Sequence, residues 1–183
     1  MRMTQTLGAV MVVGSCFLVG CAPMRVSSHV DRDRDFTHYR TFDWGPADRL
    51  PAGDQRLERD AFYQDHVQGA VERNLAARGF ERADATATPD VRIHFHAVID
   101  RRIAASQLDA QSGYCDRDNC QTGVSEYEEG TLVVDVIDVR TNRLVWRGWA
   151  RDSVEGVLEN QDRLARKIEE GVRLMFMRLP ATR

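Results

Sequence analysis

Two histidines separated by one residue, His94 and His96, are the side chains most suggestive of chemistry in this sequence of 183 residues. Alternate residues of a β-strand point to the same face, so both imidazoles can share a metal ion if a third ligand approaches. His38, Asp135 or Asp138 could supply that ligand, depending on the order of the strands. A neutral His96 could also act as a general base, but no serine or cysteine stands in a recognisable nucleophile motif. We therefore expect no metal, no cofactor and no catalysis.

The four cysteines divide into two pairs with different expected fates. Cys16 and Cys21 lie near the start of the chain, whereas Cys115 and Cys120 enclose four residues in a polar stretch. An exported chain meets an oxidising compartment, so we expect the second pair to form a local disulfide. A zinc site would need two more ligands at suitable spacing, and a redox-active pair is usually separated by two residues.

The first twenty residues have the organisation of an export signal. A short positive start precedes an uncharged apolar run over residues 7–19, which is too short to span a bilayer. The run ends in Leu18-Val19-Gly20-Cys21, which resembles the lipobox of bacterial lipoproteins. That resemblance implies removal of residues 1–20 and acylation of Cys21, and Ala22 after the cysteine favours the outer membrane over the inner one. We expect a lipid-anchored protein that faces the periplasm.

Composition restricts the class of the remaining chain. The sequence is 43% hydrophobic and 29% charged, with 25 basic and 28 acidic residues and a formal net charge of −3. That balance excludes the usual kind of nucleic-acid-binding protein, whose surface is strongly basic. The length suits one domain, which we place at 36–180. The lipidated N-terminus and a polar stretch over 21–35 are expected to form a flexible tether before it.

Hydrophobic periodicity predicts the element order β-α-β-β-β-α within that domain. Strands are expected where β-branched and aromatic residues gather or alternate with polar ones, over 36–44, 90–100, 129–139 and 144–151. Helices are expected where apolar residues recur every three or four positions, over 55–78 and 158–179. Gly79 and Pro180 stand just beyond the helix ends. A polar insertion over 101–125 carries Cys115 and Cys120, and Thr141-Asn142 predicts a hairpin turn.

These elements predict a two-layer α+β domain in which a mostly antiparallel sheet carries two helices on one face. The first strand-helix-strand step suits a parallel crossover. Trp146 alternates in step with Leu144 and is expected to point into the core. Trp149 alternates in step with Arg147 and Arg151 and is expected to point outward, where these three side chains form a candidate partner-binding surface.

Several short motifs resemble a known family when they are taken together. They are Phe36-x-x-Tyr39-x-Thr41-Phe42-x-Trp44, Gly79-Phe80, Pro89-Asp90-Val91, Glu129-Gly-Thr-Leu-Val-Val-Asp-Val-Ile-Asp138 and Leu144-Val-Trp-Arg-Gly148. In this order they resemble the domain-of-unknown-function 4136 family of small bacterial lipoproteins, from about Phe36 to Pro180. The family has no established activity, so the resemblance implies an envelope location and this fold but no catalytic residue.

Anchor, fold and site residues together favour a binding or structural module of the cell envelope. Its expected partner is another envelope protein or a glycan. Two alternatives stay open: a lipoprotein that binds a small ligand or metal through His94 and His96, and an envelope hydrolase with an unrecognised site.

Overall fold

Six strands form a single mixed sheet in this computed structural model, which describes residues 23–45, 53–105 and 124–181. The strands are β1 (Arg25–Val30), β2 (Thr41–Trp44), β3 (Glu81–Arg82), β4 (Val91–Ala105), β5 (Val124–Asp138) and β6 (Arg143–Ser153). The helices are the short 3-10 helix η1 (Phe36–His38), α1 (Gln55–Glu58), α2 (Ala61–Ala76) and α4 (Gln161–Phe176). Along the sheet the strands follow the order β1-β6-β5-β4-β2-β3.

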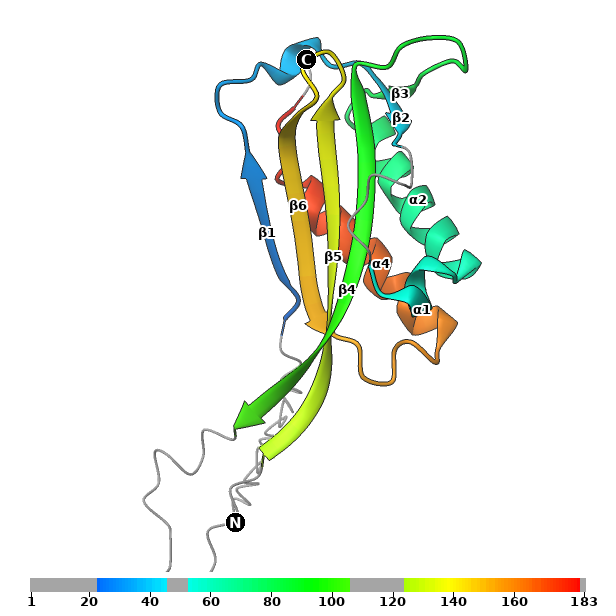
Figure 1. Cartoon of the computed structure of the whole chain (residues 1–183), viewed down its shortest axis with the longest axis vertical. Coiled ribbons are helices and arrows are strands. Elements are labelled where there is room, and N and C mark those ends of the chain that lie inside the picture. The colour runs from blue at the N-terminus through cyan, green and yellow to red at the C-terminus, as the bar shows by residue number, and fades with distance from the viewer. Residues whose placement is uncertain (1–22, 46–52, 106–123, 182–183) are drawn as a thin grey trace, which may run out of the picture.

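The two-layer α+β architecture is confirmed, with α2 and α4 on one face of the sheet (Figure 1). The pairs β1–β6, β6–β5 and β5–β4 are antiparallel. Strand β2 runs parallel to β4, with Phe42 opposite Val91, so the predicted crossover is also confirmed. We call the face covered by α2 and α4 the inner face and the opposite one the outer face.

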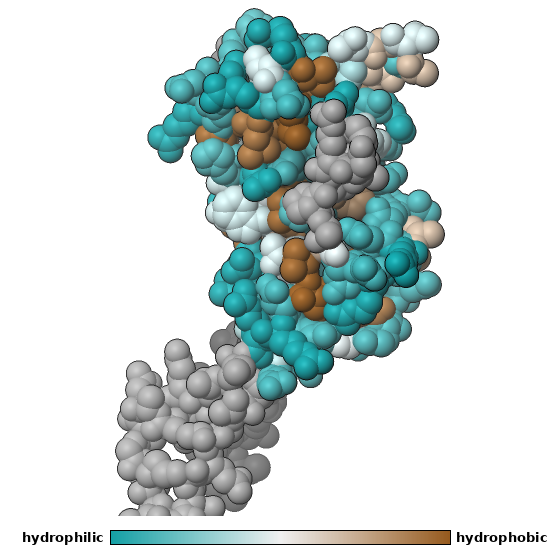
Figure 2. Space-filling view, in the orientation of Figure 1, coloured by the Kyte–Doolittle hydropathy of each residue, from teal (hydrophilic) through white to brown (hydrophobic). Residues whose placement is uncertain are grey.

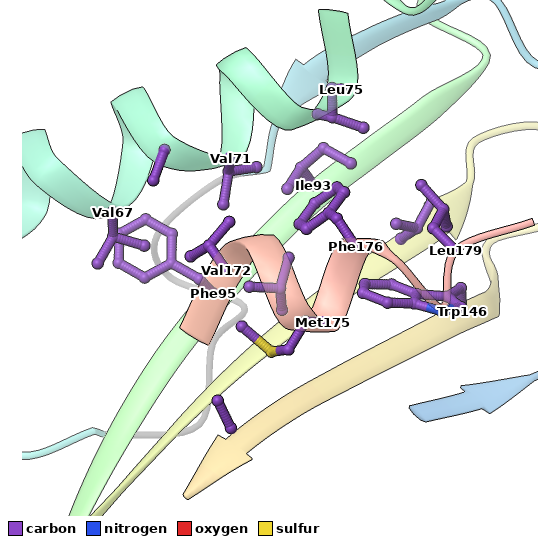
Figure 3. Packing of buried hydrophobic residues seen from close by; sticks show 14 of the residues in the cluster. Val67, Val71, Leu75, Ile93, Phe95, Trp146, Val172, Met175, Phe176 and Leu179 are labelled. Carbon is purple, nitrogen blue, oxygen red and sulfur yellow. The ribbon is translucent and has the colours of Figure 1, made fainter. Parts of the chain in front are cut away.

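The hydrophobic core fills the space between the helices and the inner face (Figure 3). Trp146 on β6 is fully buried there, and its ring lies 5.4 Å from that of Phe176 on α4. Gly148 makes room for this indole, because a Cβ at that position would lie 2.3 Å from the Trp146 ring. The prediction that Trp146 points into the core is confirmed.

Local sequence signals explain where the helices begin and end. Asp60 accepts hydrogen bonds from the backbone N–H groups of Phe62 and Tyr63, which starts α2 and separates it from α1. The single helix expected over 55–78 is therefore two helices. Gly79 follows α2 with φ of 83°, a backbone conformation that glycine adopts at little cost.

The expected tether over 21–35 is wrong for the part that the structure describes. Arg25–Val30 forms edge strand β1, which pairs antiparallel with β6 from Arg25 opposite Arg151 to Val30 opposite Trp146. Val26 and Val30 pack against the core, and this apolar contact together with the backbone pairing holds the segment to the sheet. The alternating Asp and Arg run that suggested a spacer belongs to the turn after β1.

Two further boundaries differ from the expectation. The strand expected over 36–44 is β2 and covers only 41–44, because η1 occupies residues 36–38. The insertion expected over 101–125 is shorter, because β4 continues to Ala105 and β5 begins at Val124. Cys115, Cys120 and Cys21 lie outside the described residues, as does the expected signal at 1–20. No helix in the described part of the chain is long and apolar enough to cross a membrane.

Candidate functional site on the outer face

The sheet brings both groups of predicted site residues to its outer face. His94 and His96 on β4 share this face with Arg147, Trp149 and Arg151 on β6, and β5 lies between them. This face is turned toward the viewer in Figure 1, and in the same view Figure 2 shows hydrophobic patches between hydrophilic side chains. Residues that were predicted from separate motifs therefore form one surface.

A charged row crosses the middle of this face. His94 stands opposite Asp135, which stands opposite Arg147. The Asp135 carboxylate accepts two hydrogen bonds from the Arg147 guanidinium, at 2.6 Å from Nε and 2.7 Å from the terminal nitrogen. Asp135 and the His94 ring are buried. Gly45 lets that ring lie against the backbone of the chain, because a Cβ there would be only 2.0 Å from its Cε1 atom.

The neighbouring row is largely apolar. His96 stands opposite Val133, and Val133 stands opposite Trp149. Trp149 is only partly buried, so its predicted outward direction is confirmed. Val98, two residues beyond His96 on the same face, is 38% exposed and is one of only two large hydrophobic side chains so exposed in the described ranges. Such an apolar centre with arginines around it has the composition of a protein-binding surface.

The surroundings of His96 favour the neutral form of its ring. Burial of the ring lowers the pKa of His96 below its ordinary value, and Arg147 lowers it further while Asp135 partly offsets both. Its Nδ1 atom is buried and has no hydrogen-bond partner in the part of the chain that the structure describes.

Replacement of His96 by glutamine is expected to weaken the pH dependence of stability below neutrality. The folded pKa of His96 lies below the unfolded value of about 6.5, so the unfolded state binds more protons as the pH falls through that value. Between pH 7 and pH 5, the free energy of unfolding of the native chain should therefore drop more than that of His96→Gln. The difference between the two slopes against pH should correspond to the uptake of less than one proton on unfolding. Urea titrations across this range measure the difference, and identical pH profiles would contradict the assignment.

The structure separates most of the proposed metal ligands. Asp138 lies on the inner face, where it accepts hydrogen bonds from Tyr39 and Thr141, and His38 pairs with Asp35 in η1. Asp135 is opposite His94, but both of its oxygens are engaged by Arg147. Within the described ranges, no three histidine, cysteine, aspartate or glutamate side chains gather closely enough to hold a metal ion.

A groove of about 690 Å³ lies at the end of the sheet that carries the β5–β6 turn, and two of the four acids that line it, Asp90 and Asp138, support the fold. Asp90 accepts hydrogen bonds from the backbone of Arg40 and Thr41. Burial, then the hydrogen bond to Asp138, raises the pKa of Tyr39 to about 12. Burial would raise the pKa of Asp138, but its hydrogen bonds to Thr141 and Tyr39 outweigh that effect and lower it. The carboxylates of Asp90 and Asp138 therefore hold loops to the sheet.

An arginine cluster at the opposite end of the outer face was missed by sequence reasoning. Glu129 is 3% exposed and lies 2.6 Å from Arg25, 3.2 Å from Arg102 and 3.5 Å from Arg151. From the sequence, Arg25 was placed in a tether and Arg102 in the insertion, so neither residue was expected beside Glu129. Only a prediction that included β1 and the full length of β4 could have placed Arg25 and Arg102 on the same face as Glu129. We call these four residues the arginine cluster.

Comparison with known proteins supports the fold. A solved PDZ domain protein from Parabacteroides distasonis is 19% identical with a TM-score of 0.52, over 87% of this chain and 37% of that one. The chain thus spans little more than a third of that relative, and at this identity the likeness concerns the fold alone. Two PelC dodecamers from Paraburkholderia phytofirmans are 9% and 11% identical, with TM-scores of 0.39 and 0.41. They cover 82% and 88% of this chain and 97% and 99% of their own chains.

Sequence comparison assigns the family. No curated protein matches the chain. The model of a domain of unknown function, DUF4136, matches residues 26–181, which includes all of β1 except Arg25 and all the elements that follow it. The chain therefore belongs to the DUF4136 family.

Proposed function

We propose that the chain is a lipid-anchored module of the bacterial envelope that binds another envelope protein through the outer face of its sheet. Acylation of Cys21 would hold it to the outer membrane, with the domain in the periplasm. The surface works by contact in this proposal, without a catalytic step.

The carrying observation is the partly exposed Trp149 on β6, next to edge strand β1, on a face that no described helix covers. Val133 lies beside it, with His96 in the same row and Val98 two residues farther along β4. Aromatic side chains in an apolar centre contribute most of the binding energy at many protein interfaces. A face of this kind is otherwise a liability, because exposed apolar side chains favour aggregation.

The neighbours of Trp149 favour a protein over a glycan. Val98 and Val133 offer branched aliphatic surface, which packs well against other apolar side chains. Arg147 is already paired with Asp135, so it fits at the rim of an interface where its remaining donors meet polar groups or water. Glycan recognition relies more on free polar donors and acceptors beside an aromatic ring, and binding of an envelope glycan in place of a protein would overturn this choice.

The experiment is chemical cross-linking of the tagged, acylated protein in intact cells, followed by mass spectrometry of the captured proteins. One envelope protein should be captured reproducibly, and Trp149→Ala should reduce its yield about tenfold, the effect of losing about 1.4 kcal/mol of binding energy. Met177→Ala is the control, because Met177 is 65% exposed on the helical side of the domain. Equal yields from both variants would contradict the proposed surface.

A further inference from the structure

The start of β1, the end of β4 and the start of β5 lie at the same end of the domain. Arg25 stands opposite Arg151, which stands opposite Thr131, and Thr131 stands opposite Val98. Beyond this row β4 and β5 continue as a two-stranded arm, residues 100–105 and 124–129, that projects past the body of the sheet (Figure 1). We call this the arm.

From that row, the chain that leads back to Cys21 is shorter than the part of β4 that continues into the arm. Cys21 precedes Arg25 by four residues, which can span at most about 14 Å. The seven residues of β4 beyond Val98 extend about 23 Å. If Cys21 is acylated, as the proposed function requires, its α-carbon lies close to the lipid headgroups. In an upright domain the arm is then longer than the linker that separates the domain from the membrane.

The arginine cluster lies at the base of this arm. Its guanidinium groups are accessible, since the side chains of Arg25, Arg102 and Arg151 are 70%, 44% and 38% exposed. On the outer face, these three positive charges are opposed by Glu129 and by Asp100, which lies 3.6 Å from Arg102, so the outer face of this end has a net charge of +1. Arg101, Glu126 and Glu128 alternate with these residues along the arm and belong to its other face. Guanidinium groups form paired hydrogen bonds with phosphate oxygens, so a cluster of this charge suits phosphate esters at a surface.

We propose that this end of the domain rests on the membrane that holds the anchor, with the arm against the headgroups and the arginine cluster in contact with lipid phosphates. This orientation rests on the proposed acylation of Cys21. It leaves the row of His96, Val133 and Trp149 above the membrane and open to a partner from the side.

The test is photo-crosslinking to phospholipids in cells grown with radioactive phosphate. A photoreactive phenylalanine derivative replaces Tyr127, which stands on the arm opposite Arg102, or Arg140, which is exposed in the turn at the far end of the sheet. The acyl anchor itself carries no phosphorus, so label on the purified, denatured protein reports headgroup contact. We expect at least five times more label from position 127 than from position 140.

Substitution of two arginines tests the role of the cluster. Arg25→Ser combined with Arg151→Ser should lower the label at position 127 at least threefold, whereas Arg143→Ser, in an exposed arginine at the far end, should leave it unchanged. Thermal unfolding of each variant checks that it folds. The comparison of positions 127 and 140 needs no arginine variant, so it tests the orientation even if the double variant does not fold.

Each outcome has a definite meaning. Equal labelling at the two positions, or protein adducts in place of lipid at position 127, would overturn the orientation. Mass spectrometry of the peptide that begins at Cys21 separates this result from failure of the anchor. An acylated chain without lipid adducts refutes the orientation alone, and a chain without acylation refutes both proposals.

Discussion

Replacing Trp146 with alanine is expected to lower the free energy of unfolding by about 3–5 kcal/mol, the usual cost of truncating a buried tryptophan. Trp146 is fully buried on the inner face, where its ring packs against Phe176 and over Gly148. Its indole Nε1 has no hydrogen-bond partner among the described residues, so the loss is one of apolar packing. The melting temperature should fall by roughly 10 °C for a chain of this length.

Trp149→Ala is the matched control for this prediction, since it removes the same side chain from the same strand. Trp149 is partly exposed on the outer face, so we expect a loss of about 1 kcal/mol or less. Urea or thermal unfolding of the two variants gives the comparison. A comparable loss from both would show that Trp149 serves the core, and the proposed surface would lose its central residue.

Cys21→Ser is expected to abolish the incorporation of labelled fatty acid into the protein, because the lipobox resemblance makes the Cys21 thiol the site of acylation. The apolar run over residues 7–19 stays on this variant and can hold it at a membrane, so the fatty-acid label is the readout and membrane fractionation is not. Cys16→Ser is the control, because Cys16 lies within residues 1–20, which the lipobox resemblance predicts to be removed. Metabolic labelling with a fatty acid measures the result. Equal fatty-acid label on Cys21→Ser and on the native chain would contradict acylation of this residue.

The fold was predictable where the sequence repeats one simple pattern over many residues. The alternation from Val91 to Ile99 identified β4 and placed His94 and His96 on one face, as the pairing with β5 confirms. The opposite directions of Trp146 and Trp149 followed from the same alternation. The recurrence of apolar residues every three or four positions likewise predicted α2 and α4.

Other features depend on contacts between distant residues and were not predictable from local pattern. Strand β1 has only two apolar positions facing the core, Val26 and Val30, and it is held by pairing with a strand more than 115 residues later. Without β1, nothing in the sequence relates Arg25 to Glu129. The split of the first helix depends on a single capping residue, Asp60, within an otherwise helical pattern.

At the candidate site too, local pattern predicted some features and contacts between distant residues determined the others. The sequence identified its residues but could not show that they share one surface, because that depends on β5 lying between β4 and β6. Strand order also fixed where the proposed third ligands of a metal at His94 and His96 lie. It placed Asp138 on the inner face and Arg147 beside Asp135, so both acids have other partners.

The most direct test of the central claim is site-specific photo-crosslinking of the acylated protein in intact cells, comparing the two faces of the domain. The photoreactive residue replaces either Val98, which is exposed on the outer face, or Arg166, which is exposed on α4. The proposed function predicts one discrete protein adduct from position 98 that is absent from position 166 and is lost with Trp149→Ala. Adducts from position 166 alone, or a correctly anchored protein that forms none from position 98, would contradict it.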